Sequence, residues 1–99
     1  MKEKINIAVI GAGWWCTDFH LPYLSSLENV NLYSVCRYGK KELELVKNKN
    51  KFKFASENFK ESLSYKELDG AIISTPHVEH FVCAKEALEK KLHVVIEKP

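Results

Sequence analysis

Short apolar segments alternate with amphipathic segments along this chain of 99 residues. The first, Ile5–Ile10, is mostly apolar and rich in β-branched residues, and its period is neither strictly two nor about 3.6. That pattern is typical of a strand buried on both faces, as in a parallel sheet. Four further segments also favour strands: residues 30–36, 52–55, 71–74 and 92–96.

Helical periodicity lies between these segments. Helices are predicted for residues 14–27, 40–49 and 77–90, with a short helix or turn within residues 57–68. Pro22 disturbs the first helix, which would need a kink or a later first turn. The apolar residues that recur at helical spacing in the last helix, and that we expect on its packed side, are Phe81, Ala84, Ala87 and Leu88.

Strand and helix segments alternate throughout, with short connections and without internal repeats or a long linker. This alternation is the signature of right-handed βαβ units. It predicts a single α/β domain with three layers, in which helices cover a doubly wound parallel sheet. The composition agrees, because 45% hydrophobic and 28% charged residues are ordinary for a globular domain.

Charge and cysteine content narrow the function classes. A net charge of +2 is too small to argue for nucleic acid or an anionic membrane as a partner. No segment has the length of a membrane span, and the charged start lacks the apolar region of a signal peptide. Cys16, Cys36 and Cys83 are an odd number without a CxxC pair, which favours reduced thiols in a cytoplasmic protein.

A glycine loop directly follows the first strand: Gly11, Ala12, Gly13, Trp14, Trp15 and Cys16. The chain needs glycine at Gly11 for a tight turn, and at Gly13 because a Cβ would keep a pyrophosphate away from the backbone. Main-chain N–H groups and the helix dipole would then hold the phosphates. Cys16 replaces the third glycine of the G-x-G-x-x-G pattern, a position that serves helix–strand packing. The loop predicts a Rossmann-type dinucleotide site.

Alternatives remain open at this loop. It could be a glycine turn of any α/β protein. Trp14 and Trp15 either cover the cofactor or pack on a neighbouring element. Cys16 stands at a helix N-terminus, where thiolates are stabilised, and is either reactive or simply packed.

The end of the second strand indicates which dinucleotide is preferred. An acid there would hold the adenosine ribose of NAD, but Arg37 stands at this position and would pair with the 2′-phosphate of NADP. Tyr38 or Arg37 could stack on adenine, and Lys40 or Lys41 could add charge. The alternative is that Arg37 is a solvated loop cation. Arg37 also weakens a methyltransferase reading, in which an acid would hold the ribose of S-adenosylmethionine.

Four segments, IAVIGAG, STPHVEH, ALEKKLHVV and the terminal EKP, together resemble the Gfo/Idh/MocA family of oxidoreductases. This family includes glucose–fructose oxidoreductase and inositol dehydrogenase, and the resemblance covers essentially all of the chain. It implies hydride transfer between a nicotinamide and a carbon bearing oxygen, usually on a sugar or polyol. The expected cofactor is NADP, preferred because of Arg37, or NAD.

The resemblance also implies roles for residues after the fourth strand. The Thr75–Pro76 turn, which follows Ser74, would lie beside the nicotinamide half of the cofactor. His77 stands where the family commonly has Asn, which leaves its contact open. His80 matches a commonly retained histidine that begins the helix.

The catalytic candidate comes from the terminal EKP. By the resemblance, Lys98 borders the nicotinamide and orients or polarises the substrate, and Glu97 helps to fix the nearby backbone and cofactor. From the residues alone, an ammonium at the carboxyl end of a parallel strand lies where open α/β sheets bind ligands and could stabilise charge on a carbonyl oxygen. The alternative is a surface lysine that follows a strand.

Two further histidine positions give weaker evidence for a functional site. His77, His80 and Cys83 have helical spacing and superficially resemble a metal face with Glu79 nearby. Such a set would need a fourth group or water, and the Thr75–Pro76 turn accounts better for the location, so no metal is expected. His93, in the fifth strand, is expected to be a packed or edge residue.

Members of this family continue past the EKP motif into an α+β domain with the substrate pocket and usually the oligomer contacts. We therefore expect residues 1–99 to be the NAD(P)-binding domain of a chain truncated after EKP, with little catalysis by itself. A sugar-like substrate and a homo-oligomer would depend on the missing domain. The second hypothesis is a non-catalytic dinucleotide-binding module that senses NADP(H) or pairs with a separately encoded partner.

Overall fold

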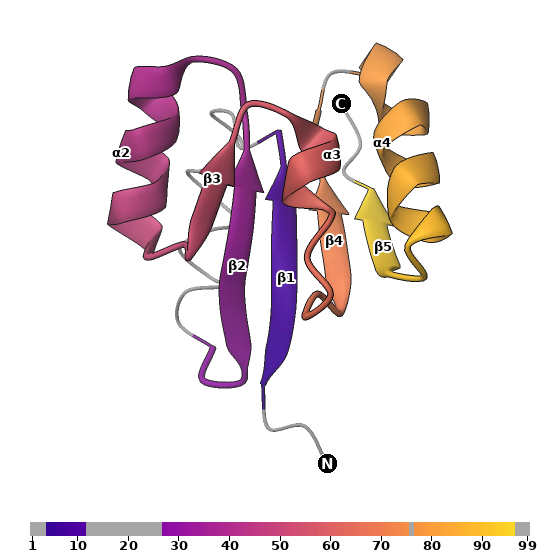
Figure 1. Ribbon diagram of the computed structural model, residues 1–99, viewed down its shortest axis with the longest axis horizontal. Helices are drawn as coiled ribbons and strands as arrows, with labels where there is room; N and C mark the ends of the chain where they lie inside the picture. The colour runs from indigo at the N-terminus through magenta and orange to yellow at the C-terminus, as the bar shows by residue number, and fades with distance from the viewer. Residues whose placement is uncertain (1–3, 12–26, 76, 97–99) are drawn as a thin grey trace.

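The computed structural model describes residues 4–11, 27–75 and 77–96, and of residues 77–80 only the backbone. In this part of the chain five parallel strands form one sheet in the order β3-β2-β1-β4-β5 (Figure 1). The strands are β1 (Ile5–Ile10), β2 (Val30–Cys36), β3 (Phe54–Ser56), β4 (Gly70–Ile73) and β5 (His93–Ile96). The helices are α2 (Lys40–Asn50), α3 (Phe59–Ser62) and α4 (His77–Glu89). The predicted parallel α/β sheet is confirmed.

Helices cover both faces of the sheet, and each face has its own core (Figure 1). On one face Leu43 and Val46 of α2 pack with Val9 of β1. On the other face α3 and α4 lie together, and Cys83 of α4 belongs to the same cluster as Ile73 of β4. Because parallel strands in this arrangement are apolar on both sides, the segment pattern of the sequence already indicated the three layers.

One irregularity of the sheet orients residues toward α3. Along β1, two consecutive residues pair with Leu32 and Ser34 of β2, so Tyr33 is the extra residue of a β-bulge. Tyr33 lies in the α3–α4 core, and the Ser34 Oγ donates a hydrogen bond of 2.7 Å to the Ser62 carbonyl oxygen. The bulge therefore turns two successive side chains to one face, which strict strand alternation would forbid.

Most element boundaries agree with the sequence predictions within one residue, but β3 does not. It was expected at residues 52–55 and forms at Phe54–Ser56. Phe52 instead packs into the core beneath α2 and is only 4% exposed, so its apolar character reflects burial and not strand pairing. The predicted short helix within residues 57–68 is α3. The predicted helix at residues 14–27 lies outside the described residues except for Leu27, which is in a loop.

The expected packed side of the last helix is wrong at its two largest residues. Phe81 and Leu88 are 66% and 62% exposed, whereas Cys83 and Ala87 are buried against the sheet. The apolar residues of α4 therefore occupy two faces of the helix, and the face with smaller side chains is the one that packs. Together with Ile96 of the edge strand β5, the two exposed residues line a shallow apolar groove.

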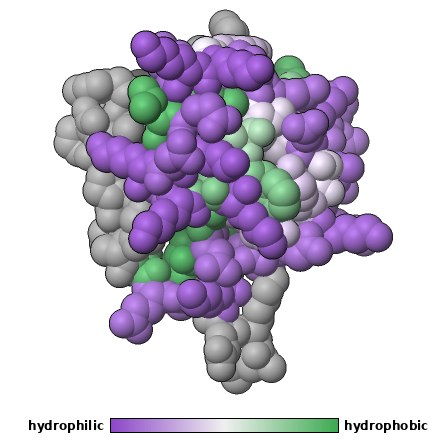
Figure 2. Space-filling model, turned by 60° about the vertical axis from the view of Figure 1, so that its left-hand side comes forward, coloured by the Kyte–Doolittle hydropathy of each residue, from purple (hydrophilic) through white to green (hydrophobic). Residues whose placement is uncertain are grey.

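The side of the molecule that carries α2 is mainly hydrophilic (Figure 2). Lys40, Lys41 and Glu44 of α2 are exposed there, while Leu43 points to the core. Among the described residues no helix combines the length and the apolar character needed to cross a membrane.

Candidate functional site

The parallel strands bring their carboxyl ends to one edge of the sheet (Figure 1). From β1 the chain builds β2 and β3 on one side, and then crosses to β4 and β5 on the other side. Open α/β sheets bind ligands outside the carboxyl ends of the strands, where the strand order reverses in this way. The candidate site therefore lies where β1, β2 and β4 end, at Gly11, Arg37 and Ser74.

The peptide group between Ile10 and Gly11 joins the ends of three strands. Its N–H donates to the Cys36 carbonyl oxygen at 2.7 Å, and the Ser74 N–H donates to the Ile10 carbonyl oxygen at 2.8 Å. Gly11 has a φ of +84°, and a Cβ at this position would lie 2.8 Å from the Ser74 carbonyl carbon and from the Thr75 Cα. Both the backbone conformation and the space therefore require glycine, as the sequence predicted.

Thr75 adds a polar group to this junction between the ends of β1 and β4. Its Oγ1 is buried and has no hydrogen-bond partner within the described part of the chain, and its Cγ2 would lie 2.8 Å from a Cβ on Gly11. A buried hydroxyl without a partner costs about 1–3 kcal/mol. Bare backbone beside a hydroxyl that needs a partner is the arrangement expected where a polar ligand approaches the main chain. The residues present therefore fit a dinucleotide at this junction.

The end of β2 forms the second part of the site. Arg37 is partly exposed, and its Nε donates to the Tyr38 carbonyl oxygen at 3.1 Å. The Tyr38 side chain is 69% exposed, so its ring face is accessible to a flat ligand. Gly39 follows with a φ of +95°, and α2 begins immediately after it. The structure thus places Arg37 and Tyr38 at the same sheet edge as Gly11, while their contacts to a cofactor stay a prediction.

Two carboxylates at this turn were not singled out from the sequence. The Glu57 Oε2 accepts a hydrogen bond of 3.0 Å from the Gly39 N–H. In addition, a Cβ on Gly39 would lie 2.5 Å from the Glu42 Oε2, so this side chain folds back over the turn. The signal for Glu57 was its place directly after the third strand, since the carboxyl ends of neighbouring parallel strands meet.

Several predicted site residues lie outside the described part. These are Ala12, Gly13, Trp14, Trp15, Pro76, Glu97 and Lys98, and Cys16 with them. His77 and His80 belong by their backbone to the first turn of α4, which begins two residues after Thr75 at the carboxyl edge of the sheet. Of the remaining residues, the structure brings Gly11, Ser74 and Thr75 together at the junction between β1 and β4, and places Arg37 and Tyr38 at the end of the next strand, β2.

Of the pattern that resembles a metal face, the structure describes the side chain of Cys83 and the backbone of His77, Glu79 and His80. Cys83 is 2% exposed and packs in the α3–α4 core, so its thiol faces the sheet. Among the described residues no group of three or more His, Cys, Asp or Glu side chains could hold a metal ion. His93 is exposed at the first position of the edge strand β5, which confirms the edge alternative.

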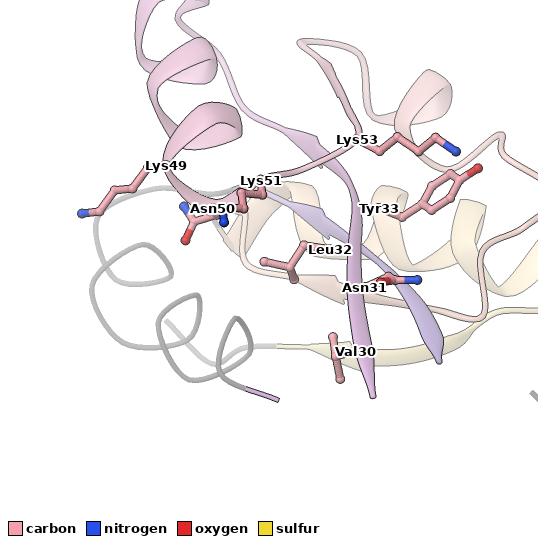
Figure 3. Close-up of a pocket in the computed structure, with 8 residues that line it drawn as sticks. All are labelled: Val30, Asn31, Leu32, Tyr33, Lys49, Asn50, Lys51 and Lys53. Carbon is pink, nitrogen blue, oxygen red and sulfur yellow. The ribbon is translucent and has the colours of Figure 1, made fainter. Parts of the chain in front are cut away.

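A hollow beside the amino-terminal half of β2 is a separate feature (Figure 3). Its volume of about 490 Å³ is within the usual range of ligand pockets, about 300–1,000 Å³. The lining residues are Val30, Asn31, Leu32, Tyr33, Lys49, Asn50, Lys51 and Lys53. The Lys49 and Lys53 side chains point in opposite directions, so these cations do not converge on one ligand (Figure 3). This hollow also lies away from the carboxyl edge of the sheet.

Aromatic packing explains where Lys53 points. Its Nζ lies 5.3 Å from the ring centroid of Tyr33 and 5.7 Å from that of Phe54, which stacks on Tyr65 with centroids 4.3 Å apart. Burial raises the pKa of the Tyr33 phenol, and the hydrogen bond of 3.1 Å that it donates to the Glu67 Oε1 raises the pKa further. Burial likewise raises the pKa of Tyr65. These phenols therefore stay neutral near pH 7 and stabilise the fold.

Comparison with known sequences identifies a family model and two relatives that match this chain. The Gfo/Idh/MocA family model, described as an oxidoreductase family with an NAD-binding Rossmann fold, matches residues 5–99. The chain is 29% identical to the uncharacterized oxidoreductase YdgJ of Escherichia coli K12, covering all of this chain and 28% of YdgJ. It is 26% identical to the uncharacterized oxidoreductase sll0816 of Synechocystis, covering 99% of this chain and 26% of that protein. The chain thus spans just over a quarter of the length of these relatives.

Solved structures share the fold. The scyllo-inositol dehydrogenase of Lactobacillus casei, solved with NAD(H) and scyllo-inositol, superposes with a TM-score of 0.87 at 23% identity, over 97% of this chain and 28% of that one. The 3-ketoreductase KijD10 of Actinomadura kijaniata, solved with NADP and TDP-benzene, gives a TM-score of 0.88 at 21% identity, over 97% and 29%. The family match over almost the whole chain and the doubly wound parallel sheet agree, so the chain belongs to the Gfo/Idh/MocA family of oxidoreductases and carries its NAD-binding Rossmann domain.

Proposed function

We propose that the carboxyl edge of this sheet binds NADP(H) or NAD(H) for hydride transfer to or from a sugar-like or polyol substrate. The observation that carries the proposal is the junction between the ends of β1 and β4. There Gly11 has no room for a Cβ, and the Thr75 Oγ1 is buried without a partner among the described residues. Because the chain spans only part of its relatives, the reaction is proposed for the protein that contains this domain.

Three groups of residues would hold the cofactor. The glycine loop, residues 11–15, would bind the pyrophosphate through main-chain N–H groups at the start of a helix. Arg37 and Tyr38 would hold the adenosine half, and residues 74–77 with His80 would lie along the nicotinamide half. The bound nicotinamide would supply or accept the hydride, while these residues orient it and keep water from its reacting face.

We propose NADP(H) as the preferred cofactor. Arg37 directly follows β2, where a guanidinium can form charge-assisted hydrogen bonds with a 2′-phosphate. Among proteins of the same fold, the Lactobacillus casei enzyme was solved with NAD(H) and KijD10 with NADP, so the fold accommodates either cofactor. The preference in this chain therefore depends on its own side chains at the end of β2.

The substrate side of the proposal involves Lys98. Lys98 follows β5 by two residues, after an edge strand that ends at Ile96. An ammonium at this edge would stabilise negative charge on a substrate carbonyl oxygen. A polyol or sugar substrate is supported by the scyllo-inositol bound to the Lactobacillus casei enzyme.

Cys36 and Cys83, both buried thiols of the core, support a reducing compartment such as the cytoplasm.

A nucleotide titration tests the proposal. NADPH and NADH are added to the 99-residue chain, and binding is followed by calorimetry and by the fluorescence of its two tryptophans, Trp14 and Trp15. We expect saturable binding of both nucleotides, with NADPH tighter. Guanosine triphosphate, which has the same kind of charge but no nicotinamide, serves as the control. Equal and weak binding of all three nucleotides would contradict a dinucleotide site.

A further inference from the structure

The carboxylate of Glu57 lies at the place where the 2′-phosphate of NADP(H) is expected. Cys36 pairs with Ser56 across β2 and β3, so the next residues, Arg37 and Glu57, follow at the same edge of the sheet. The Glu57 Oε2 accepts the Gly39 N–H at 3.0 Å, in the turn between Arg37 and the start of α2. A main-chain N–H at a helix start is a group that binds anions.

Local hydrogen bonds fix the segment that carries Glu57. The Ser56 Oγ accepts the Asn58 N–H at 2.9 Å, and the Asn58 Oδ1 caps α3 by accepting the Lys60 N–H at 2.9 Å. These bonds hold the backbone on both sides of Glu57. Its side chain is exposed, so it can leave the Gly39 N–H without disturbing a core.

The turn also carries a second acid. Glu42, in the first turn of α2, folds back over Gly39. Two carboxylates and the cations Arg37, Lys40 and Lys41 therefore share this end of β2. A 2′-phosphate would gain the cations but would have to approach two negative charges, whereas a 2′-hydroxyl would meet no such repulsion.

We propose that Glu57 is a specificity residue of the cofactor site, which holds the Gly39 N–H beside the ribose of NAD(H) and must release it for the 2′-phosphate of NADP(H). This inference rests on the proposed function, because it needs the adenosine half of a dinucleotide at the end of β2. Glu57 thus opposes Arg37, and the cofactor preference is the balance of the two side chains. A carboxylate here could also accept a hydrogen bond from a 2′-hydroxyl.

The test compares two variants that lose one negative charge each. Glu57→Gln keeps the size of the side chain and an oxygen for the Gly39 N–H, and Glu44→Gln removes a charge from the exposed face of α2 as the matched control. Dissociation constants for NADPH and NADH are measured by calorimetry on the 99-residue chain at low salt. Glu57→Gln should shift the affinity ratio about fivefold toward NADPH, the size of one exposed charge interaction. Glu44→Gln should shift it less than about twofold, since water screens a more distant exposed charge.

The outcomes distinguish the proposed dinucleotide site from the role of Glu57. If the wild-type chain binds neither nucleotide, the proposed function fails and the role of Glu57 fails with it. If the wild type binds both and Glu57→Gln changes the ratio no more than Glu44→Gln, the dinucleotide site stands and the role of Glu57 is wrong. A shift in Glu57→Gln that disappears at about 1 M salt would support the electrostatic cause, because screening there acts over about 3 Å.

Discussion

Replacement of Gly11 by alanine is the most direct perturbation of the junction between β1 and β4. The new Cβ would lie 2.8 Å from the Ser74 carbonyl carbon, the Thr75 Cα and the Thr75 Cγ2. Two of these atoms belong to the backbone, so a change of side-chain rotamer cannot relieve the overlap. The φ of +84° adds strain, because residues with a Cβ rarely adopt it.

The expected cost follows from these two effects. A left-handed backbone costs a residue with a Cβ about 1–2 kcal/mol. Overpacking by one carbon in a tight site costs about 1–3 kcal/mol. Gly11→Ala should therefore lower the free energy of unfolding by about 2–5 kcal/mol, compared with about 5–15 kcal/mol for a typical domain. The backbone shift that relieves the overlap would also move the ends of β1 and β4 apart, so NADPH affinity should fall in the fraction that still folds.

Each measurement has its own glycine control: Gly39→Ala in guanidinium unfolding and Gly70→Ala in NADPH titration. At Gly39 (φ +95°) a Cβ would meet only the flexible end of Glu42, so Gly39→Ala isolates the strain of the backbone. At Gly70 a Cβ would lie 3.0 Å from the His93 carbonyl oxygen, at the opposite end of the sheet, so Gly70→Ala should spare binding. If Gly11→Ala unfolded within about 1 kcal/mol of Gly39→Ala and bound NADPH normally, the overlap argument would be refuted.

Four further predictions concern other residues described above. Arg37→Asp should lower the ratio of NADPH to NADH affinity by about tenfold or more, the loss of a charge-assisted hydrogen bond, and an unchanged ratio in calorimetry would remove Arg37 from the site. In a longer protein that contains this domain, Lys98→Ala should abolish turnover and spare cofactor binding, whereas near-normal turnover would exclude it from the mechanism. Tyr33→Phe should lower the free energy of unfolding by about 0.5–1.5 kcal/mol, because the bond to Glu67 is lost. The raised phenol pKa values of Tyr33 and Tyr65 make stability fall as pH rises above 10.0, since the unfolded chain then releases protons that the folded chain retains. In the double Phe variant, stability should fall less as the pH rises, as measured by melting curves taken on both sides of pH 10. An equally steep fall would show that these two phenols do not cause the pH dependence.

The sequence predicts features that depend on local pattern. Ile5–Ile10 was assigned correctly because a strand covered on both faces is apolar without strict alternation. The glycine requirement at Gly11 was also visible, since a tight turn after a strand restricts the residue type. The short helix α3 was anticipated only as an alternative to a turn, because it has too few residues for a clear period.

Features that depend on long-range packing were missed. Phe52 was included in a strand because burial beneath α2 gives it the same apolar character as strand residues. Phe81 and Leu88 were assigned to the packed face because periodicity does not reveal which of two apolar faces meets the sheet. The sequence does not predict Glu57 as a site residue, because its contact with Gly39 depends on the pairing of β2 with β3, which joins residues far apart in the sequence.

The contact between Gly11 and the end of β4 consists of main chain on both sides apart from one methyl group. Its width is therefore inherited from the spacing of neighbouring strands, about 4.8 Å, and not from the size of particular side chains. Substitutions on the surface or in the cores can accumulate without altering this width, as long as β1 and β4 keep the register that pairs Ile10 with Ile73. A slip of one residue in that register would displace the junction as a whole, even if every residue that forms it were unchanged.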